Sequence, residues 1–398
     1  MTTSPPREDF RLRSVAVAAY GPTILEGIGY GAAIPIVPLL ARQLGATVGQ
    51  AALVAGLLGV GQLCASLPAG AMIARIGERR AMVIASVGGA LTAAIASSAL
   101  SVLVLGAAAF VTGMTWSVFL LARQGFMIDA VPEHLRARAL STLGGSHRIG
   151  MVIGPLVGTA VIHQWGIRAA FVASVLASLA ALLLVLRVDD LGHEARELGR
   201  ADPASTWTLL RRHTRVLASL GTSAMTINGL RAVRLSVLPL WGEHIGLSAS
   251  QVSMVFAIGA LVEVAIFYPA GWVMDRRGRA MVAVPCAGLL ALGFLVLPLT
   301  ASLAGLLAVT FLMAVGNGLG SGIVMTLGAD TAPVVHRAKY LGGWRLCGDI
   351  GASGGPLVVS AIIAATGLAS ASLAVGGLAL AGTAWIAHWV SALDRRRR

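Results

Sequence analysis

The sequence predicts an all-α membrane protein with twelve transmembrane helices in two six-helix, pseudo-symmetric bundles. Of its 398 residues, 57% are hydrophobic and only 12% are charged, whereas about 25% of the residues of a soluble domain are charged. Long apolar runs alternate with short polar loops, and the two halves of the chain repeat each other at one constant offset. So much apolar surface excludes a compact soluble enzyme.

Twelve apolar stretches are each long enough for a membrane span, which takes about 20 residues. They cover residues 14–40, 48–73, 81–100, 103–128, 139–162, 168–187, 216–241, 248–273, 280–299, 303–328, 341–365 and 368–390. The second, fourth, fifth, seventh, eighth and eleventh contain Gly, Pro or charge. We therefore expect these helices to face protein or water rather than lipid.

The net charge of +13 arises from 30 basic and 17 acidic residues. When the loops are assigned alternately to two sides, one side receives only Arg42 and Arg168 as basic loop residues, and the other side receives the clusters. This asymmetry is typical of a cytoplasmic membrane face and indicates a lipid bilayer, not a nucleic acid, as the partner. We expect a multi-pass protein of a bacterial cytoplasmic (inner) membrane, with both termini cytoplasmic.

An internal repeat divides the chain. An offset of 201 positions pairs Pro38 with Pro239, Gly45 with Gly246, Gln50 with Gln251, Arg75 with Arg276, Asp129 with Asp330, and Gly154-Pro155 with Gly355-Pro356. Two parallel repeats of this kind are typical of secondary transporters, whose substrate site lies between the halves near mid-bilayer. We predict an N-terminal bundle at 1–187, a cytoplasmic linker at 188–214 and a C-terminal bundle at 215–398.

Two motifs are repeated or glycine-rich. The loop after the second span carries Gly70, Arg75 and Gly77, and its repeat carries Gly271, Asp275, Arg276 and Gly278. The fifth span carries Gly150, Gly154, Pro155 and Gly158, a small-residue face for helix packing with a proline that can bend the helix.

These motifs resemble those of the major facilitator superfamily, and of its 12-helix drug:proton antiporter branch in particular. The resemblance implies the major facilitator fold and a charge network that holds the halves together on the cytoplasmic side. Ala74 stands where the family has Asp in the first copy, so whether this copy weakens the gate is open. For the fifth span, the resemblance implies a face that seals the halves during antiport, and a plain packing surface is the alternative.

A repeated Asp-x-x-Pro-x-x-x-Arg pattern ends the fourth and tenth spans. It places Asp129 before Arg136 and Asp330 before Arg337. We interpret both as ion pairs that fix a gate or a loop.

Eight ionisable residues fall deep inside the predicted spans. They are Glu26, Arg123, Arg148, Arg231, Arg234, Glu263, Arg345 and Asp349. A charge at this depth costs about 3 kcal/mol or more, so each is a functional candidate. Glu26 lies roughly 20 Å along its helix from the cytoplasmic end, where its carboxyl group can exchange a proton as access alternates. The alternative for Glu26 is a structural ion pair with Arg231 or Arg234.

The other ionisable residues are candidates for proton coupling or for lining the cavity, each because of its position or spacing. Glu263 lies at mid-span, as Glu26 does. Arg345 and Asp349 are spaced i, i+4 and predict a pair, structural or functional, and Arg148 occupies the repeat position of Asp349. Asn228 precedes Arg231 and Arg234 at spacings of three and six, which favours a cavity lining, whereas Arg123 departs from the RxxQG pattern of the antiporter branch.

The function indicated is secondary active transport: proton-coupled efflux of small amphiphilic molecules, such as drugs, antibiotics or metabolites, by alternating access. The alternatives are a proton symporter or facilitator that imports a nutrient or metabolite and, more remotely, a membrane enzyme or lipid-handling protein. Because the deep arginines outnumber the deep acids, we expect a neutral, zwitterionic or anionic amphiphile as substrate. The sequence has no nucleotide-binding GxxxxGK[ST] motif, and no metal or cofactor is expected beyond the proton gradient. We expect a monomer without enzymatic activity.

Overall fold

The computed structural model describes residues 12–131, 133–187, 211, 213–320, 322–333 and 337–397, and all secondary structure in these ranges is helical. The N-terminal half contains α1 (Leu12–Ala33), the 3₁₀ turn η1 (Ile34–Ile36), α2 (Val37–Gln43), α3 (Val48–Ile76), α4 (Glu78–Ser98), α5 (Val102–Ala130), α6 (Glu133–Trp165) and α7 (Ala169–Leu186). The C-terminal half contains α10 (Thr214–Val216), the π turn η2 (Leu217–Gly221), α11 (Thr222–His244), α12 (Ala249–Arg277), α13 (Ala280–Val296), the 3₁₀ turn η3 (Leu297–Leu299), α14 (Leu303–Leu319), α15 (Ile323–Thr331), α16 (Arg337–Thr366) and α17 (Leu368–Arg397). Most of the predicted linker, and the side chains of Asp129, Arg136 and Arg337, lie outside the described residues.

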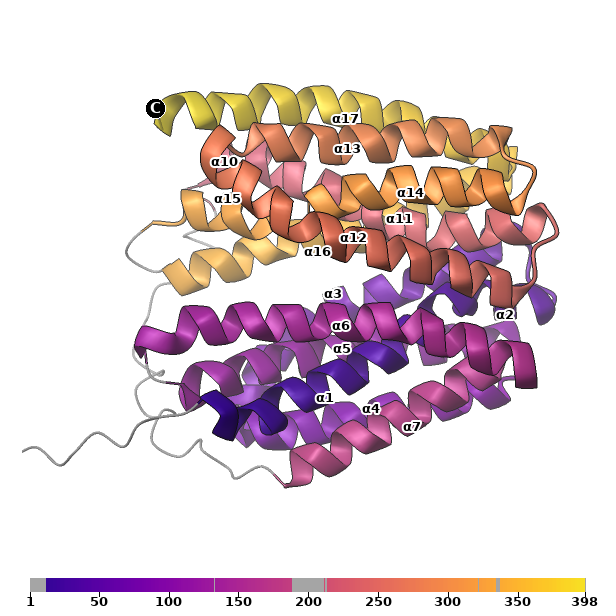
Figure 1. Ribbon diagram of the computed structural model, residues 1–398, viewed down its shortest axis with the longest axis horizontal. Coiled ribbons are helices and arrows are strands. Elements are labelled where there is room, and N and C mark those ends of the chain that lie inside the picture. The colour runs from indigo at the N-terminus through magenta and orange to yellow at the C-terminus, as the bar shows by residue number, and fades with distance from the viewer. Residues whose placement is uncertain are drawn as a thin grey trace, which may run out of the picture.

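The twelve predicted spans all coincide with helical segments, but two are interrupted. The first is broken at Ile34–Ile36, where Pro35 and Pro38 cannot donate backbone hydrogen bonds. The tenth ends at Leu319 and resumes at Ile323. In the described part of the chain, ten helical stretches are long and apolar enough to cross a membrane. The two predicted spans outside this set are α6 and α11, whose polar and charged residues lower their hydropathy, and both run alongside the other helices (Figure 1).

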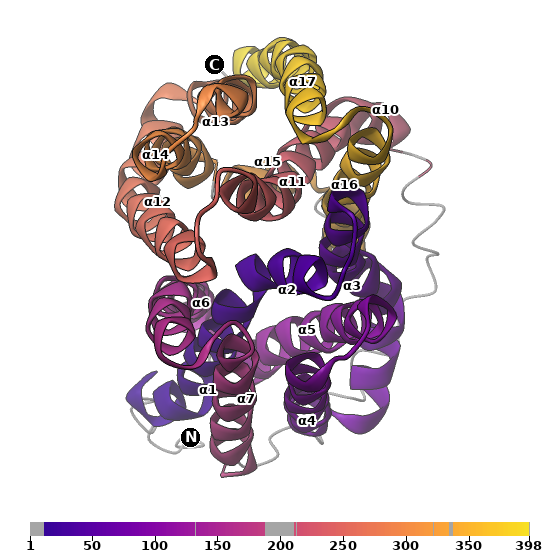
Figure 2. The same cartoon turned by 90° about the vertical axis from the view of Figure 1, so that its right-hand side faces the viewer.

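The helices form two bundles, one of α1 to α7 and one of α11 to α17 (Figure 1). Seen from one end (Figure 2), α3 lies against α16 and α6 against α12, so these two helix pairs join the bundles. Serine hydroxyls of the C-terminal half donate to backbone carbonyls of the N-terminal half along both pairs. Ser353 Oγ lies 2.7 Å from the Gly59 oxygen, and Ser253 Oγ lies 2.8 Å from the Pro155 oxygen.

Equivalent local structures recur at the offset of 201. A capping box starts α3, where the Thr47 side chain accepts from the Gln50 amide, and the same box starts α12 with Ser248 and Gln251. The turn glycine Gly77 has φ 89° and its repeat Gly278 has φ 101°, a left-handed backbone that favours glycine. The sequence repeat is therefore a structural repeat.

The two ends of the molecule differ in how the bundles meet. We call the end where α1 begins and α17 ends the basic end. At the other end, Arg42 Nε lies 3.1 Å from a carboxylate oxygen of Glu243, an ion pair between repeat-equivalent residues of the two halves. At the basic end, the bundles diverge (Figure 1), and the ion pair of Arg279 with Asp330 lies within the C-terminal half. The described contacts between the bundles thus close the end that carries Arg42.

Candidate functional site

A central cavity of about 240 Å³ lies between the two bundles. Tyr30, Gln62 and Trp116 line it from the N-terminal half, and Asn228 and Arg231 line it from the C-terminal half. Arg231 is the one charged residue in this described lining, and the remaining walls are largely apolar. The cavity lies where the repeat predicts a substrate site.

The N-terminal wall of the cavity is an aromatic stack. The rings of Tyr30 and Trp116 are parallel within 7°, with centroids 4.1 Å apart. The Gln62 amide donates to the Tyr30 hydroxyl at 2.7 Å, and the His147 ring lies 5.4 Å from the Trp116 ring. Four helices, α1, α3, α5 and α6, supply these side chains, so the wall depends on the packing of the whole N-terminal bundle.

On the C-terminal wall, α11 presents Asn228 and Arg231 one turn apart. Arg231 Nη2 lies 3.5 Å from the Asn317 carbonyl oxygen, and Arg231 Nε finds no hydrogen-bond partner among the described residues. Arg234 turns away from this cavity and pairs with Glu263 of α12, with Nη2 and Oε1 2.6 Å apart. Both residues line another, smaller cavity of about 70 Å³. All three residues therefore line a cavity: Asn228 and Arg231 line the central one, and Arg234 lines the smaller one of about 70 Å³.

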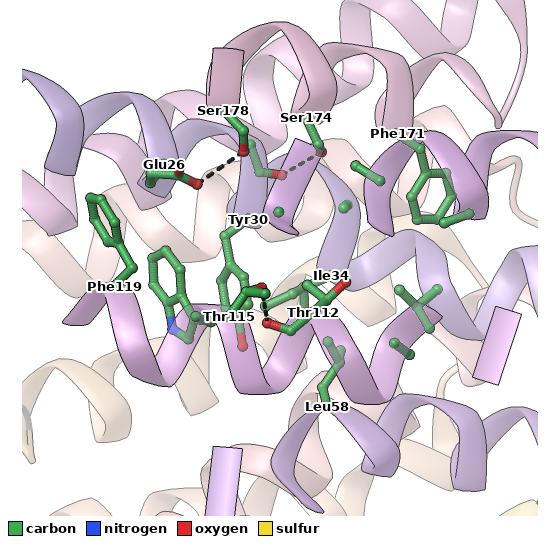
Figure 3. Close-up of a pocket in the computed structure, with 18 of the residues that line it drawn as sticks. Glu26, Tyr30, Ile34, Leu58, Thr112, Thr115, Phe119, Phe171, Ser174 and Ser178 are labelled. Carbon is green, nitrogen blue, oxygen red and sulfur yellow. Dashed lines mark hydrogen bonds between the residues drawn. The ribbon is translucent and has the colours of Figure 1, made fainter. Parts of the chain in front are cut away.

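Glu26 lies in a separate cavity of about 60 Å³ inside the N-terminal bundle (Figure 3). Its side chain is buried, and the Ser178 hydroxyl donates to Oε2 at 3.0 Å. The buried hydroxyl of Ser86 on α4 also hydrogen-bonds to this carboxyl group. The residues that line both this cavity and the central one are Tyr30, Ile34, Leu58 and Trp116. The alternative that Glu26 pairs with Arg231 or Arg234 is not what the structure shows.

The remaining deep charges lie around the contact between the bundles. Arg345 Nε lies 3.8 Å from Asp349 Oδ2, as the i, i+4 spacing predicts, and the Ser66 hydroxyl of the other half lies 3.0 Å from the same oxygen. Arg148 lies over the Phe267 ring of the opposite bundle at 3.9 Å, a cation–π contact between the halves.

Arg123 is a further buried cation, but it is absent from the lining of the three cavities described here. Its Nε and Nη1 atoms have no hydrogen-bond partner among the described residues.

The glycine motif of α6 contacts both bundles. A Cβ atom at Gly150 or Gly154 would collide with the backbone of α1. One turn further on, a Cβ at Gly158 would lie 2.9 Å from Ser253 Oγ of α12, and the Pro155 carbonyl accepts the hydrogen bond of Ser253. The motif is therefore a packing surface toward α1 that continues into the contact with the other bundle.

The motifs at the basic end show contacts mainly within one half. Arg279 Nε lies 2.8 Å from Asp330 Oδ2, and this hydrogen bond raises the pKa of Arg279 above its ordinary value. The predicted partner of Asp330, Arg337, has a side chain outside the described part, as do both members of the predicted Asp129 pair. Among the other motif residues, Gly70 and Gly271 are partly exposed, and Arg75 is exposed.

The second copy of the loop motif makes its described contacts within the C-terminal half. Asp275 is exposed, and no ion pair from it to the N-terminal half is present among the described residues. Arg276 lies over the Trp272 ring at 4.3 Å. The described residues at the basic end thus show no ion pair of the charge network implied by the resemblance.

Several hydrogen-bond and ion-pair partners of the candidate residues could not be predicted from the sequence. Ser178 and Ser66, which hydrogen-bond to Glu26 and Asp349, are small residues with no motif to mark them. The Arg42–Glu243 pair carries a signal, because the two residues occupy equivalent positions of the repeat and have opposite charges.

Two helical bundles around a shared central cavity are the architecture typical of secondary membrane transporters. A family model described as Major Facilitator Superfamily matches residues 23–356 and, in a second match, 223–398. The chain belongs to this superfamily, so the predicted fold class and family are confirmed.

Among curated relatives, the multidrug resistance protein MdtH of Klebsiella pneumoniae (strain 342) is 26% identical over 345 residues, which cover 80% of this chain and 81% of MdtH. The multidrug resistance protein MdtG of Erwinia billingiae is 31% identical over 156 residues, which span only 38% of either chain. Among solved structures, a POT family transporter in complex with a thioalcohol-conjugated peptide has a TM-score of 0.79 at 14% identity, covering 96% of both chains. The nucleoside transporter NupG has a TM-score of 0.77 at 12% identity, covering 94% of this chain and 99% of NupG. At such identities, the solved structures share the fold alone.

Proposed function

We propose that this protein is a proton-coupled exporter of small amphiphilic molecules that works by alternating access as a monomer. The observation that carries the proposal is the placement of Glu26, a carboxyl group sealed inside the N-terminal bundle and separated from the central cavity by the Tyr30–Trp116 stack. In this proposal the basic end faces the cytoplasm of a bacterium, both termini are cytoplasmic, and the inward proton gradient is the energy source.

The surroundings of Glu26 suit a group that gains and loses a proton. A hydroxyl such as that of Ser178 donates to a carboxylate and accepts from a carboxylic acid, so it serves both protonation states. The described lining of this cavity includes no basic residue to hold the carboxylate charged, and an uncompensated charge at such a site is costly. Protonation when the cavity opens to one side, and release when it opens to the other, then couples the gradient to the conformational change.

Glu263 has a different environment. It is paired with Arg234 at 2.6 Å, so its charge is already compensated. We assign proton coupling to Glu26 first. We give Glu263 and Asp349 the secondary role of ion pairs that rearrange as the bundles rock.

The contacts between the bundles support an inward-facing state in this scheme. The Arg42–Glu243 pair closes the outer end, and the basic end is the divergent one. The substrate then enters the central cavity from the cytoplasm. The multidrug resistance proteins among the relatives favour export of amphiphilic compounds over uptake.

Proton movement in everted membrane vesicles tests the proposal. The vesicles are made acid inside, amphiphilic compounds are added one at a time, and a pH-sensitive dye reports proton release. We expect compound-dependent release by the wild type and its loss in Glu26→Gln. Glu78→Gln, which removes a carboxyl group at the start of α4, is the matched control and should retain release.

Release that survives both Glu26→Gln and Glu263→Gln would contradict the assignment of the carboxylates and point to Asp349. If no compound releases protons from vesicles that contain folded protein, uptake by symport or uncoupled transport becomes the better function.

A further inference from the structure

The lining of the central cavity narrows the class of substrate. We propose that it binds a compact amphiphile with one or two fused aromatic rings and a single carboxylate, the carboxylate against Arg231 and Asn228 and the rings against Tyr30 and Trp116. This inference rests on the proposed function only in taking the central cavity as the substrate site.

The charge balance around the cavity favours an anion. Arg231 is the one charged residue of the described lining. Nearby acids are already compensated, since Glu263 pairs with Arg234 at 2.6 Å and Asp349 pairs with Arg345 at 3.8 Å. A cationic ligand would therefore meet an uncompensated positive charge, whereas an anionic ligand would neutralise it.

Glu26 does not alter this balance, because it lines the other cavity. The aromatic stack of Tyr30 and Trp116 lies between the two spaces. A carboxylate ligand against the C-terminal wall therefore lies on the far side of this stack from Glu26.

The polar groups on the C-terminal wall are suited to a carboxylate. Arg231 Nη2 lies 3.5 Å from the backbone oxygen of Asn317, and the guanidinium group also hydrogen-bonds the Cys286 thiol, so contacts within the C-terminal bundle hold Arg231 at the cavity wall. Asn228 lies one turn earlier on α11 and lines the same cavity. The positive charge of Arg231 attracts a carboxylate, and the Asn228 amide supplies a hydrogen-bond donor for it on the same wall.

The opposite wall and the cavity size define the rest of the ligand. Tyr30 and Trp116 are the aromatic residues of the described lining, and their parallel stack presents a ring surface to the cavity. The volume of about 240 Å³ is below the roughly 300–1,000 Å³ of most ligand pockets. We therefore expect one or two fused rings rather than a large polycyclic drug.

Equilibrium binding without a proton gradient tests this inference. Full-length protein in lipid nanodiscs at a single pH is titrated calorimetrically with three probes of the same size: 2-naphthoate, the neutral 2-naphthamide and the cationic 2-naphthylmethylamine. We expect 2-naphthoate to bind at least about tenfold more tightly than the other two, the scale of a charge-assisted hydrogen bond.

Variants then locate the anion. Arg231→Gln should weaken 2-naphthoate binding by about tenfold or more and leave 2-naphthamide unchanged, and Arg231→Lys should retain part of the preference. Arg80→Gln removes an exposed arginine at the start of α4 and is the matched control, expected to bind like the wild type. If Arg231→Gln does not fold, Asn228→Ala provides a second test, with a smaller loss confined to the carboxylate.

Tighter binding of the cationic probe, or equal binding of the acid and the amide, would overturn the inference. So would an equal loss for all three probes in folded Arg231→Gln. Failure of the proposed function has a different signature: 2-naphthoate binds as expected, but no compound moves protons in vesicles.

Discussion

Gly154 is the position at which a single methyl group tests the packing of the N-terminal bundle most sharply. An added Cβ would lie 2.6 Å from the Ile28 carbonyl oxygen and 2.8 Å from the Ala32 nitrogen, both of them backbone atoms of α1. Ordinary contact begins at 3.4 Å, so α1 and α6 must separate by about 0.8 Å. Backbone cannot rotate away as a side chain can, so we expect Gly154→Ala to carry an overpacking cost of about 1–3 kcal/mol.

The same helix contains the matched control. A Cβ at Gly144 has no atom within 4 Å, so Gly144→Ala should gain only the helix propensity of alanine, about 1 kcal/mol. Because both variants receive this gain, the difference between them isolates the packing cost of about 1–3 kcal/mol. Unfolding of each purified variant by detergent titration in mixed micelles measures it. If Gly154→Ala were as stable as Gly144→Ala, the close approach of α1 and α6 would be refuted.

Three further predictions concern ion pairs and a helix cap. Arg42→Gln should favour the state open at the outer end by up to about fivefold, because a partly exposed pair is worth at most about 1 kcal/mol. Distances between labels on the two bundles measure this shift, and the Arg42→Glu, Glu243→Arg exchange should reverse it. Arg234→Gln should destabilise the fold by about 3 kcal/mol, since it leaves Glu263, whose side chain is 19% exposed, without its cation, and replacing both residues with leucine should restore more than half of the loss in the same detergent titration. Asp394→Ala should cost about 1 kcal/mol in that titration, because the Asp394 carboxylate accepts two backbone amides at the start of α13, at 3.1 and 2.8 Å, and an equal loss in Asp394→Asn would contradict this assignment.

The fold could be predicted from the sequence because its main determinants are repeated or periodic. Hydropathy located the spans, and the offset of 201 related them to each other. Local rules that depend on few atoms recur in both halves, such as the capping boxes at Thr47 and Ser248. The break at Ile34–Ile36 was missed, although Pro35 and Pro38 mark it, because apolar composition continues across it. Apolar composition alone does not show where prolines remove backbone hydrogen bonds from a helix.

The central site could be predicted only in part. Residues on the same broad face of a helix can still point in directions different enough to reach different neighbours. At about 100° per residue, the third position after Asn228 is turned by about 60°, and the sixth by about 120°. Arg231 therefore shares the cavity with Asn228, whereas Arg234 turns toward α12 and meets Glu263. Which residue lies at that angle depends on how the helices of the bundle pack, and the sequence of one helix does not determine this.

Glu26 illustrates the same limit with a functional consequence. Its depth in the first span marks it as costly and hence as a candidate, but depth does not say whether an arginine or a hydroxyl lies opposite. The structure places the hydroxyls of Ser178 and Ser86 there, whereas Arg231 and Arg234 engage other partners. An acid paired with arginine would be held charged through the cycle, whereas an acid facing a hydroxyl can exist in either protonation state. Two serine hydroxyls in place of an arginine therefore separate a proton-coupling group from a structural ion pair. For this reason we place coupling in the N-terminal bundle and substrate recognition at Arg231 in the C-terminal bundle.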